Sequence, residues 1–148
     1  MLSWSWAEER LTSSHDYWVA TLWPDGRPHV MPVWGAWFDD ACWFSSDQRS
    51  RKARNVAADN RCVITTDNAL EPVVVEGLAS LVLDRAVTAR FQDMLHAKYS
   101  AEWDDDFYTV DFFDATLGGG ATYRVEPRSV FALAASEFTA SPTRWTFD

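Results

Sequence analysis

The sequence predicts a mainly β protein, in which six or seven antiparallel strands form a small, partly open barrel and helices fill its gaps. Short segments rich in Val, Trp and Phe recur along the chain, and turn-forming residues separate them. Helical periodicity is confined to two or three short segments, and no internal repeat or linker divides the chain. At 148 residues the chain is long enough to bury one core, so we expect a single domain over 1–148.

The first part of the chain is predicted to be a helix followed by a three-stranded meander. The expected elements are a helix over 5–14, strands over 17–23, 29–38 and 41–46, and turns at 24–27 and 39–40. In the second strand Val30, Pro32 and Trp34 share one face, and His29, Met31 and Val33 share the other. Neither face is wholly polar, so we expect both to be covered. Pro32 cannot donate to a ladder, which predicts a missing or distorted strand neighbour.

The rest of the chain alternates between helices and strands. A helix is expected over 51–58 with Ser50 as N-cap, followed by strands over 61–66 and 73–83, the second of them bent at Gly77. The next helix is expected from an Asp84 cap to about Tyr99, with an apolar face made of Val87, Phe91, Met94 and Leu95. A short helix and loop over 101–120 and closing strands over 121–127 and 129–135 are expected to follow. These elements complete the predicted barrel.

A basic cluster lies in the segment SSDQRSRKARN, residues 45–55. Arg49, Arg51, Lys52 and Arg54 occupy four of six positions, in a chain with 13 cations, 22 acidic residues and a net charge of −9. The hydroxyls of Ser45, Ser46 and Ser50 precede the helix, whose first N–H groups are unpaired. Hydroxyls, amides and cations together are typical of a phosphate site, and a solvated helix face is the alternative. On a helical wheel Ala53, Val56 and Ala57 face inward, Arg51, Arg54 and Asn55 face outward, and Lys52 lies between them.

Charge and composition exclude several classes of partner and of site. The negative net charge disfavours nucleic acids and anionic membranes, because both would be repelled. The chain shows no signal peptide and no run of about 18 apolar residues, and Cys42 and Cys62 have no metal spacing, so we expect a cytoplasmic protein with reduced thiols. The histidines His15, His29 and His96 are scattered, and the aspartates over 104–114 lack the pattern of a calcium loop, so no metal site is predicted.

The runs VATLWPDGRPHVMPVW, FSSDQRSRKARNVAADNRCVITT, YRVEPRSVFAL and TRWTF resemble the flavin- and deazaflavin-binding split β-barrel oxidoreductases. That superfamily includes pyridoxamine 5′-phosphate oxidase. The resemblance covers most of the chain and is weakest over 100–120. It implies an FMN-binding type of split barrel, a homodimer, and a cofactor held between the two subunits. The second strand lacks the arginine and lysine of pyridoxamine phosphate oxidases proper, and RKARN is more similar to the branch that binds the deazaflavin coenzyme F420.

The resemblance also assigns roles to residues. Lys52 and Arg51 would contact the cofactor phosphate with help from Ser50 and Ser46. Arg54 and Asn55 match the motif and, facing outward, would serve either the loop or a ligand tail. Separately, four cations exceed what one phosphate requires, which leaves Arg49 and Arg54 free to meet an anionic tail. Met31, Pro32, Val33 and Trp34 would lie along the ring, and Trp145, with Arg144, would reach the site of a partner subunit. Trp34, Trp37 and Trp43 are core residues by default, and the alternative is that, as a group on adjacent strands, they form a wall for a planar ligand. No residue is predicted as a catalytic acid or base, because the cofactor carries the chemistry.

The functional hypothesis is hydride transfer between bound coenzyme F420 and a small apolar or aromatic acceptor. FMN is the alternative cofactor. Two hypotheses from different functional classes stand beside it. One is a non-catalytic carrier of the cofactor or of haem, and the second is an interaction module whose basic cluster binds an acidic protein.

Overall fold

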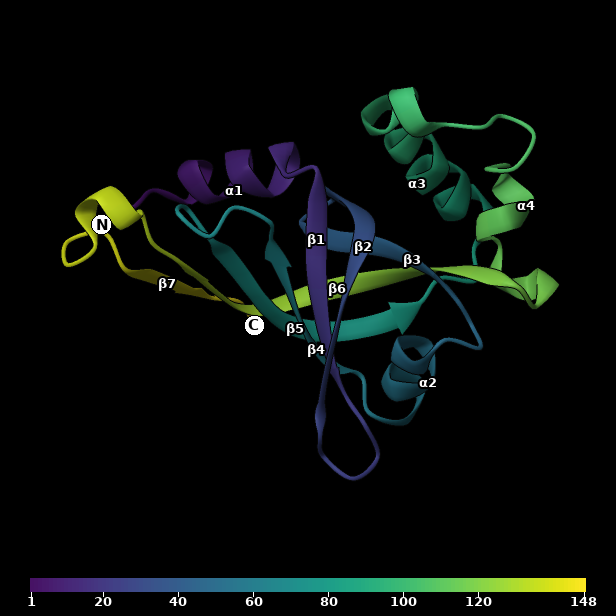
Figure 1. The fold of residues 1–148 in the computed structure, drawn as a ribbon, viewed down its shortest axis with the longest axis horizontal. Coiled ribbons are helices and arrows are strands. Elements are labelled where there is room, and N and C mark those ends of the chain that lie inside the picture. Colours follow the sequence, from purple (N-terminus) through teal and green to yellow (C-terminus); the bar gives the residue numbers. More distant parts are fainter.

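In this computed structural model, which describes residues 1–148, seven strands form one antiparallel sheet in the order β3-β2-β1-β4-β5-β6-β7. An additional pairing between β3 and β6 closes the first six strands into a barrel, and β7 extends the sheet beyond β6. The predicted mainly β split barrel is therefore confirmed, with seven strands. Figure 1 shows α1 along one side of the barrel, α3 and α4 together at the upper right, and α2 below them.

The observed elements follow the predicted order closely. The strands are β1 (Asp16–Leu22), β2 (Pro28–Phe38), β3 (Ala41–Asp47), β4 (Arg61–Thr66), β5 (Val73–Leu81), β6 (Gly120–Ala132) and β7 (Thr143–Thr146). The helices are α1 (Trp4–Ser13), α2 (Arg51–Ala58), α3 (Arg85–Lys98) and α4 (Val110–Phe113), with short 3-10 turns η1 (Ser100–Glu102), η2 (Ala115–Leu117) and η3 (Ala135–Glu137). The division of the last long strand near residue 128 was wrong, because β6 runs unbroken for 13 residues.

The barrel interior is filled by alternate side chains of its strands. Tyr17, Val19, Ile64, Val75 and Val125 are at most 1% exposed and belong to one cluster of 21 buried residues. The predicted irregularity at Gly77 is confirmed, since the register between β5 and β6 shifts between Glu76 and Gly77. This bulge lets β5 bend around the barrel while it pairs with β6 on both sides of the shift.

The strand β2 has a free edge along its first half. It pairs with β1 from Pro28 to Trp34, whereas β3 pairs with it only from Gly35 to Phe38. The sequence predicted from Pro32 that this strand has a missing or distorted neighbour, and β2 indeed has no strand on one side of residues 28–34. The prediction that both faces are covered is wrong for the single chain, because Val30 is 52% exposed and Met31 45% exposed.

A second cluster of eight buried residues lies where α3 and α4 pack against β2 and β3. It contains Phe91, Leu95, Tyr99 and Phe113, and Trp34, Tyr108 and Phe112 pack against it. Asp84 caps α3 as predicted, but Met94 of the predicted apolar face is 38% exposed. No helix of the protein combines the length and the apolar character that crossing a membrane requires.

Candidate functional site

Ser50 fixes the start of α2, as predicted. Its Oγ accepts a hydrogen bond from the N–H of Ala53 at 3.2 Å and lies 2.7 Å from the Oγ of Ser46, at the end of β3. The N–H of Arg54 bonds to the Ser50 carbonyl, whereas the N–H groups of Arg51 and Lys52 have no intrahelical acceptor. Two hydroxyls, two free amides and the positive end of α2 therefore lie together.

The helix packs on β1 with a different face from the one predicted. Asn55, expected outside, is fully buried, and its Nδ2 donates to Thr21 Oγ1 at 3.0 Å. Ala57, expected inside, is exposed, while Ala53 and Val56 are buried as predicted. A buried side-chain amide requires partners, and Thr21 and Arg51 supply them here. The sequence did not predict the burial of Asn55, because a helical wheel assigns the inward face from apolar residues and this helix has only eight residues, one of which is polar and faces inward.

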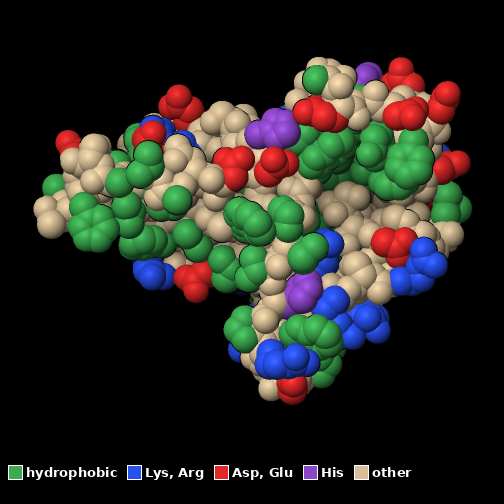
Figure 2. All heavy atoms as spheres, viewed as in Figure 1, with side chains coloured by type: hydrophobic (Ala, Val, Ile, Leu, Met, Phe, Trp, Pro, Cys, Tyr) green, Lys and Arg blue, Asp and Glu red, His purple; other side chains and the backbone are tan.

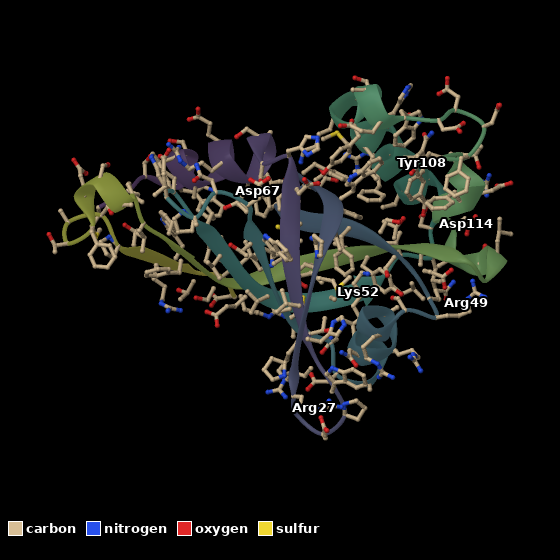
Figure 3. The ribbon with its side chains drawn as sticks, viewed as in Figure 1. Arg27, Arg49, Lys52, Asp67, Tyr108 and Asp114 are labelled. Atoms are coloured by element: carbon tan, nitrogen blue, oxygen red, sulfur yellow. The ribbon has the colours of Figure 1, made fainter.

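The four predicted cations differ in how the chain holds them. Arg49 is widely exposed and donates to both carboxylate oxygens of Asp47. The Arg51 guanidinium lies 4.1 Å from the centre of the Trp23 ring and donates to Asn55 Oδ1 at 3.2 Å. Arg54 is exposed, and neither it nor Lys52 makes an ion pair or a side-chain hydrogen bond within the chain. Figure 3 shows Lys52 between α2 and the strands, with Arg49 farther out at the β3–α2 loop.

Lys52 is a half-buried cation without a counter-ion. Burial alone lowers the pKa of its ammonium below the ordinary value of 10.5. The Nε of Arg51 is also buried and lacks a hydrogen-bond partner. Desolvated cationic groups are costly unless they are paired. At the start of α2 the chain thus leaves Lys52 and the Arg51 Nε without an acidic partner, an arrangement that suits an anion.

A glutamine holds the loop before α2 in place. Gln48 Nε2 donates to the Ala115 carbonyl at 2.9 Å, and its backbone N–H donates to the Gly119 carbonyl at 3.1 Å. Both acceptors lie near the start of β6, far along the chain. Sequence reasoning missed Gln48, because its role depends on contacts that no local pattern indicates.

The predicted ring-contacting residues lie on the free half of β2. Met31 and Pro32 are exposed, Val33 is buried, and Trp34 is half-buried. The indole of Trp34 stacks on Tyr99, with ring centres 4.3 Å apart and planes 5° from parallel. In Figure 2 the surface is hollowed between the hydrophobic side chains on the α3–α4 side and the basic side chains around α2 and the β1–β2 hairpin.

The remaining predicted aromatic residues lie elsewhere. Trp37 and Trp43 are core residues, 7% and 3% exposed. Trp145 lies on β7, where it packs edge-on against Trp4 with ring centres 5.3 Å apart. Figure 1 shows β7 and α2 on opposite sides of the molecule, so Trp145 does not join the other predicted site residues within one chain.

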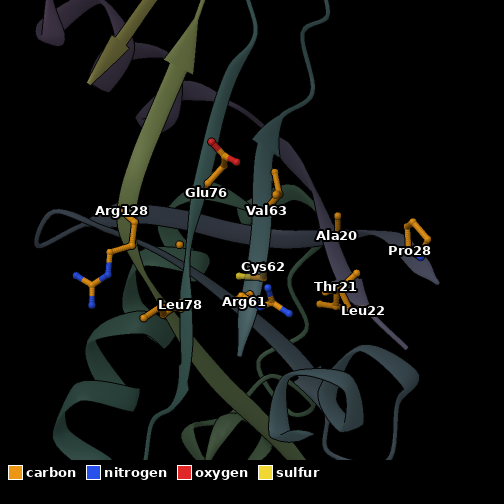
Figure 4. Close-up of a pocket in the computed structure, with 11 residues that line it drawn as sticks. Ala20, Thr21, Leu22, Pro28, Arg61, Cys62, Val63, Glu76, Leu78 and Arg128 are labelled. Atoms are coloured by element: carbon orange, nitrogen blue, oxygen red, sulfur yellow. The ribbon is translucent and has the colours of Figure 1, made fainter. Parts of the chain in front are cut away.

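A separate hollow of about 420 Å³ lies on the outer face of β1, β4 and β5, away from the start of α2 (Figure 4). Its lining residues include Ala20, Leu22, Val63 and Leu78, with Arg61, Glu76 and Arg128 at its rim. None of the predicted site residues lines this hollow. The hollow lies on the exposed apolar side of the sheet, where the side chains of Trp18 and Val30 are also exposed.

The acidic and histidine side chains of the chain form no group of three or more that could hold a metal ion. Asp111 and Asp114 both accept hydrogen bonds from Arg85, and Asp104 Oδ1 accepts from the N–H groups of Asp106 and Phe107. The acidic segment is thus engaged in structural contacts.

Comparisons with known proteins agree with this architecture. The family model described as Pyridoxamine 5'-phosphate oxidase matches residues 6–140. A search of curated protein sequences gives no match. A conserved hypothetical protein of Mycobacterium tuberculosis is similar in structure, with a TM-score of 0.74, 24% identity, and coverage of 88% of this chain and 83% of that one.

Two further structures share the fold. A protein named F420 reductase has a TM-score of 0.65 and 24% identity, over 83% of this chain and 94% of its own. A haem-binding protein from Mycobacterium smegmatis has a TM-score of 0.73 and 19% identity, over 99% of this chain and 60% of its own. At these identities the structural likeness shows the fold, while the family model covers nearly the whole sequence. The chain therefore belongs to the pyridoxamine 5'-phosphate oxidase family.

Proposed function

We propose that the protein binds the deazaflavin coenzyme F420 and transfers a hydride between it and a small apolar or aromatic acceptor. The observation that carries the proposal is Lys52, a half-buried cation with no counter-ion, beside free amides at the start of α2. A cofactor phosphate supplies the missing anion, and Arg51, Ser46 and Ser50 surround the same point. The family membership and the similarity to a protein named F420 reductase support the choice of a flavin-type cofactor.

The free half of β2 is the proposed seat of the ring system. Met31, Pro32, Val33 and Trp34 would lie along it, with backbone groups of the unpaired edge directed to its polar rim. The bound cofactor supplies the hydride chemistry. The chain's own residues hold the phosphate, orient the ring and exclude water. The aromatic side chains of Trp34, Tyr99 and Tyr108, which lie together, favour an apolar or aromatic acceptor.

We infer that the working protein is a homodimer with the cofactor between its subunits. Trp18 and Val30 are 45% and 52% exposed on the outer face of β1 and β2, beside the 420 Å³ hollow. So much apolar surface on one side of a sheet is typical of an interface. In such a dimer Trp145 and Arg144 would approach the site of the partner, which they do not approach within their own chain.

Coenzyme F420 is favoured over FMN by the number of cations. One phosphate occupies Lys52 and Arg51, while the exposed Arg54 has no partner and Arg49 has only Asp47. The deazaflavin coenzyme continues beyond its phosphate into an anionic tail, which an otherwise acidic chain would repel without these arginines.

Fluorescence titration of both cofactors at low and high salt tests the proposal. We expect coenzyme F420 to bind more tightly than FMN, with the difference narrowing as salt rises, because salt screens the exposed arginines. Equal affinities, or a preference for FMN at every salt concentration, would make FMN the cofactor. Failure to bind either cofactor would refute the proposal.

A non-catalytic carrier is the second candidate. The similarity to a haem-binding protein favours it. Steady turnover of the reduced cofactor with a quinone or an unsaturated ketone distinguishes the enzyme from the carrier. A carrier binds its ligand without oxidising it, whichever acceptor is added.

A further inference from the structure

Two side chains at the end of α3 form hydrogen bonds with the backbone of one residue of β2, Gly35. Tyr99, fully buried at the C-cap of α3, accepts a hydrogen bond from the Gly35 N–H at 3.1 Å. The neighbouring Lys98 donates from Nζ to the Gly35 carbonyl at 2.9 Å. Both polar groups of one glycine are thus bonded to consecutive side chains of a distant helix.

The strand pairing explains why these two side chains are needed. On one side of Gly35 the pairing with β1 has ended, since Asp16, the first residue of β1, lies opposite Trp34. Buried backbone groups must find partners, and here side chains take the place of the missing strand. The Tyr99 hydroxyl also donates to the carbonyl of His15, the residue just before β1.

Gly35 fits this position tightly. A Cβ atom there would lie 2.7 Å from the Trp43 carbonyl oxygen and 3.0 Å from Cδ2 of Tyr17. The Tyr17 hydroxyl, in turn, accepts a hydrogen bond from Lys98 Nζ at 2.8 Å and donates to the Leu11 carbonyl. The hold on Gly35 is therefore anchored to both β1 and the end of α1.

The same two residues connect to the proposed ring site. Gly35 directly follows Trp34, the last residue of the free half of β2, and the Tyr99 ring stacks on the Trp34 indole at 4.3 Å. A shift of Gly35 would move Trp34 and the unpaired backbone before it. Small displacements of groups that align a reacting ring are costly to catalysis.

We propose that Lys98 and Tyr99 are positioning residues for the cofactor ring, which hold Gly35 and thereby set the place of Trp34 and the free edge of β2. The inference rests on the proposed function for its ligand, whereas the hold on Gly35 can be measured without any ligand. Neither residue contacts the phosphate site at the start of α2, so their effect is directed to the ring alone.

The test compares Lys98→Met and Tyr99→Phe with Arg90→Met, a matched loss of a cation from the same helix. Arg90 pairs with the exposed Asp39 and does not touch Gly35. Hydrogen exchange of the Gly35 amide is measured by NMR without ligand. Loss of one hydrogen bond should accelerate this exchange about 3- to 10-fold in Tyr99→Phe, with a smaller acceleration in Lys98→Met and none in Arg90→Met.

Affinities are then measured for coenzyme F420 and for the same deazaflavin without its phosphate and tail. Both positioning variants should weaken the two ligands by the same factor, about 3- to 10-fold, because the lost contacts concern the ring. A loss confined to the phosphate-bearing ligand, unchanged ring affinity, or unchanged Gly35 exchange would each overturn the inference. If Lys98→Met does not fold, Tyr99→Phe, which removes one oxygen atom, gives both readouts.

The two failures are distinguishable. If the wild-type protein binds neither ligand, the proposed function fails and the positioning role falls with it, although Gly35 exchange still shows whether α3 holds β2. If the wild-type protein binds both ligands and the variants bind them equally well, only the positioning role is refuted.

Discussion

The only two lysines of the chain, Lys52 and Lys98, show how similar burial leads to different roles. Burial lowers the pKa of both ammonium groups. Lys98 is held by Tyr17 and Gly35, and nothing in the chain holds Lys52. A buried cation with partners inside the chain is typical of a structural role, whereas a half-buried cation without a partner is a candidate for ligand binding.

Replacing Lys52 should therefore affect binding far more than folding. Loss of a charge-assisted hydrogen bond is worth about 1.5–3 kcal/mol, so Lys52→Ala should weaken cofactor binding about 10- to 100-fold. Arg90→Ala is the control, because Arg90 lies on α3 and pairs with the exposed Asp39. Isothermal titration measures both variants, and an unchanged affinity in Lys52→Ala would make the cluster an ordinary solvated helix face.

Lys98 should give the protein's stability a specific pH dependence. Its pKa is lowered from 10.5 to about 8 in the folded state, mainly by burial. Between these values the unfolded chain binds more protons, so the free energy of unfolding rises with pH as the folded ammonium loses its proton. The groups that act on the Lys98 ammonium are the hydroxyl of Tyr17, the carboxylates of Asp16 and Asp67, and the thiol of Cys42.

The measurement is a comparison of wild type with Lys98→Met by chemical denaturation. Burial also raises the pKa values of Tyr17 and Cys42, which lowers stability at high pH in both proteins alike. The difference in the free energy of unfolding between the two proteins therefore reports on Lys98 alone. This difference should be independent of pH below about pH 8 and should shift in favour of wild type from there toward pH 10. A difference that stays constant across this range would contradict the assignment.

Among the elements, β5 requires a glycine, Gly77, at its bulge. A Cβ atom on Gly77 would lie 2.3 Å from the Glu126 carbonyl oxygen, a backbone atom that cannot rotate away. Gly77→Ala should therefore destabilise the protein by about 1–3 kcal/mol or more in urea denaturation. Gly119→Ala, where a Cβ would meet nothing within 4 Å, should stay within about 0.5 kcal/mol of wild type. Equal stability of the two variants would refute the steric argument.

The elements also show what the sequence could and could not predict. The caps Ser50 and Asp84 and the irregularity at Gly77 were predicted because each follows from chemistry local to the chain. The inward place of Asn55 was missed, since it depends on Thr21, which is 34 residues away. Lys98 and Tyr99 were missed for the same reason, because their partner Gly35 is polar only through its backbone. Hydrogen bonds between polar atoms that are far apart in the chain leave no periodic pattern in the sequence, so they cannot be predicted from it.

At the scale of the whole molecule, the exposed outer face of β1 and β2 predicts a dimer. Sedimentation at micromolar concentration should give twice the 16.9 kDa mass of the chain. Val30→Asp places a charge on this face and should yield monomers, whereas Leu70→Asp, at a residue 69% exposed in the β4–β5 loop, should not. A monomeric wild-type protein would remove the model of a shared site.

The free edge of β2 also bears on how the molecule avoids misassembly. An unpaired strand edge is a template to which a strand of another chain can add, and this route leads to aggregation. The barrel removes such an edge where β3 closes onto β6. Along the open stretch, Pro28 and Pro32 carry no N–H group, so an incoming strand cannot complete a ladder there. The prolines thus leave the edge accessible to a small planar molecule and unsuited to a second polypeptide.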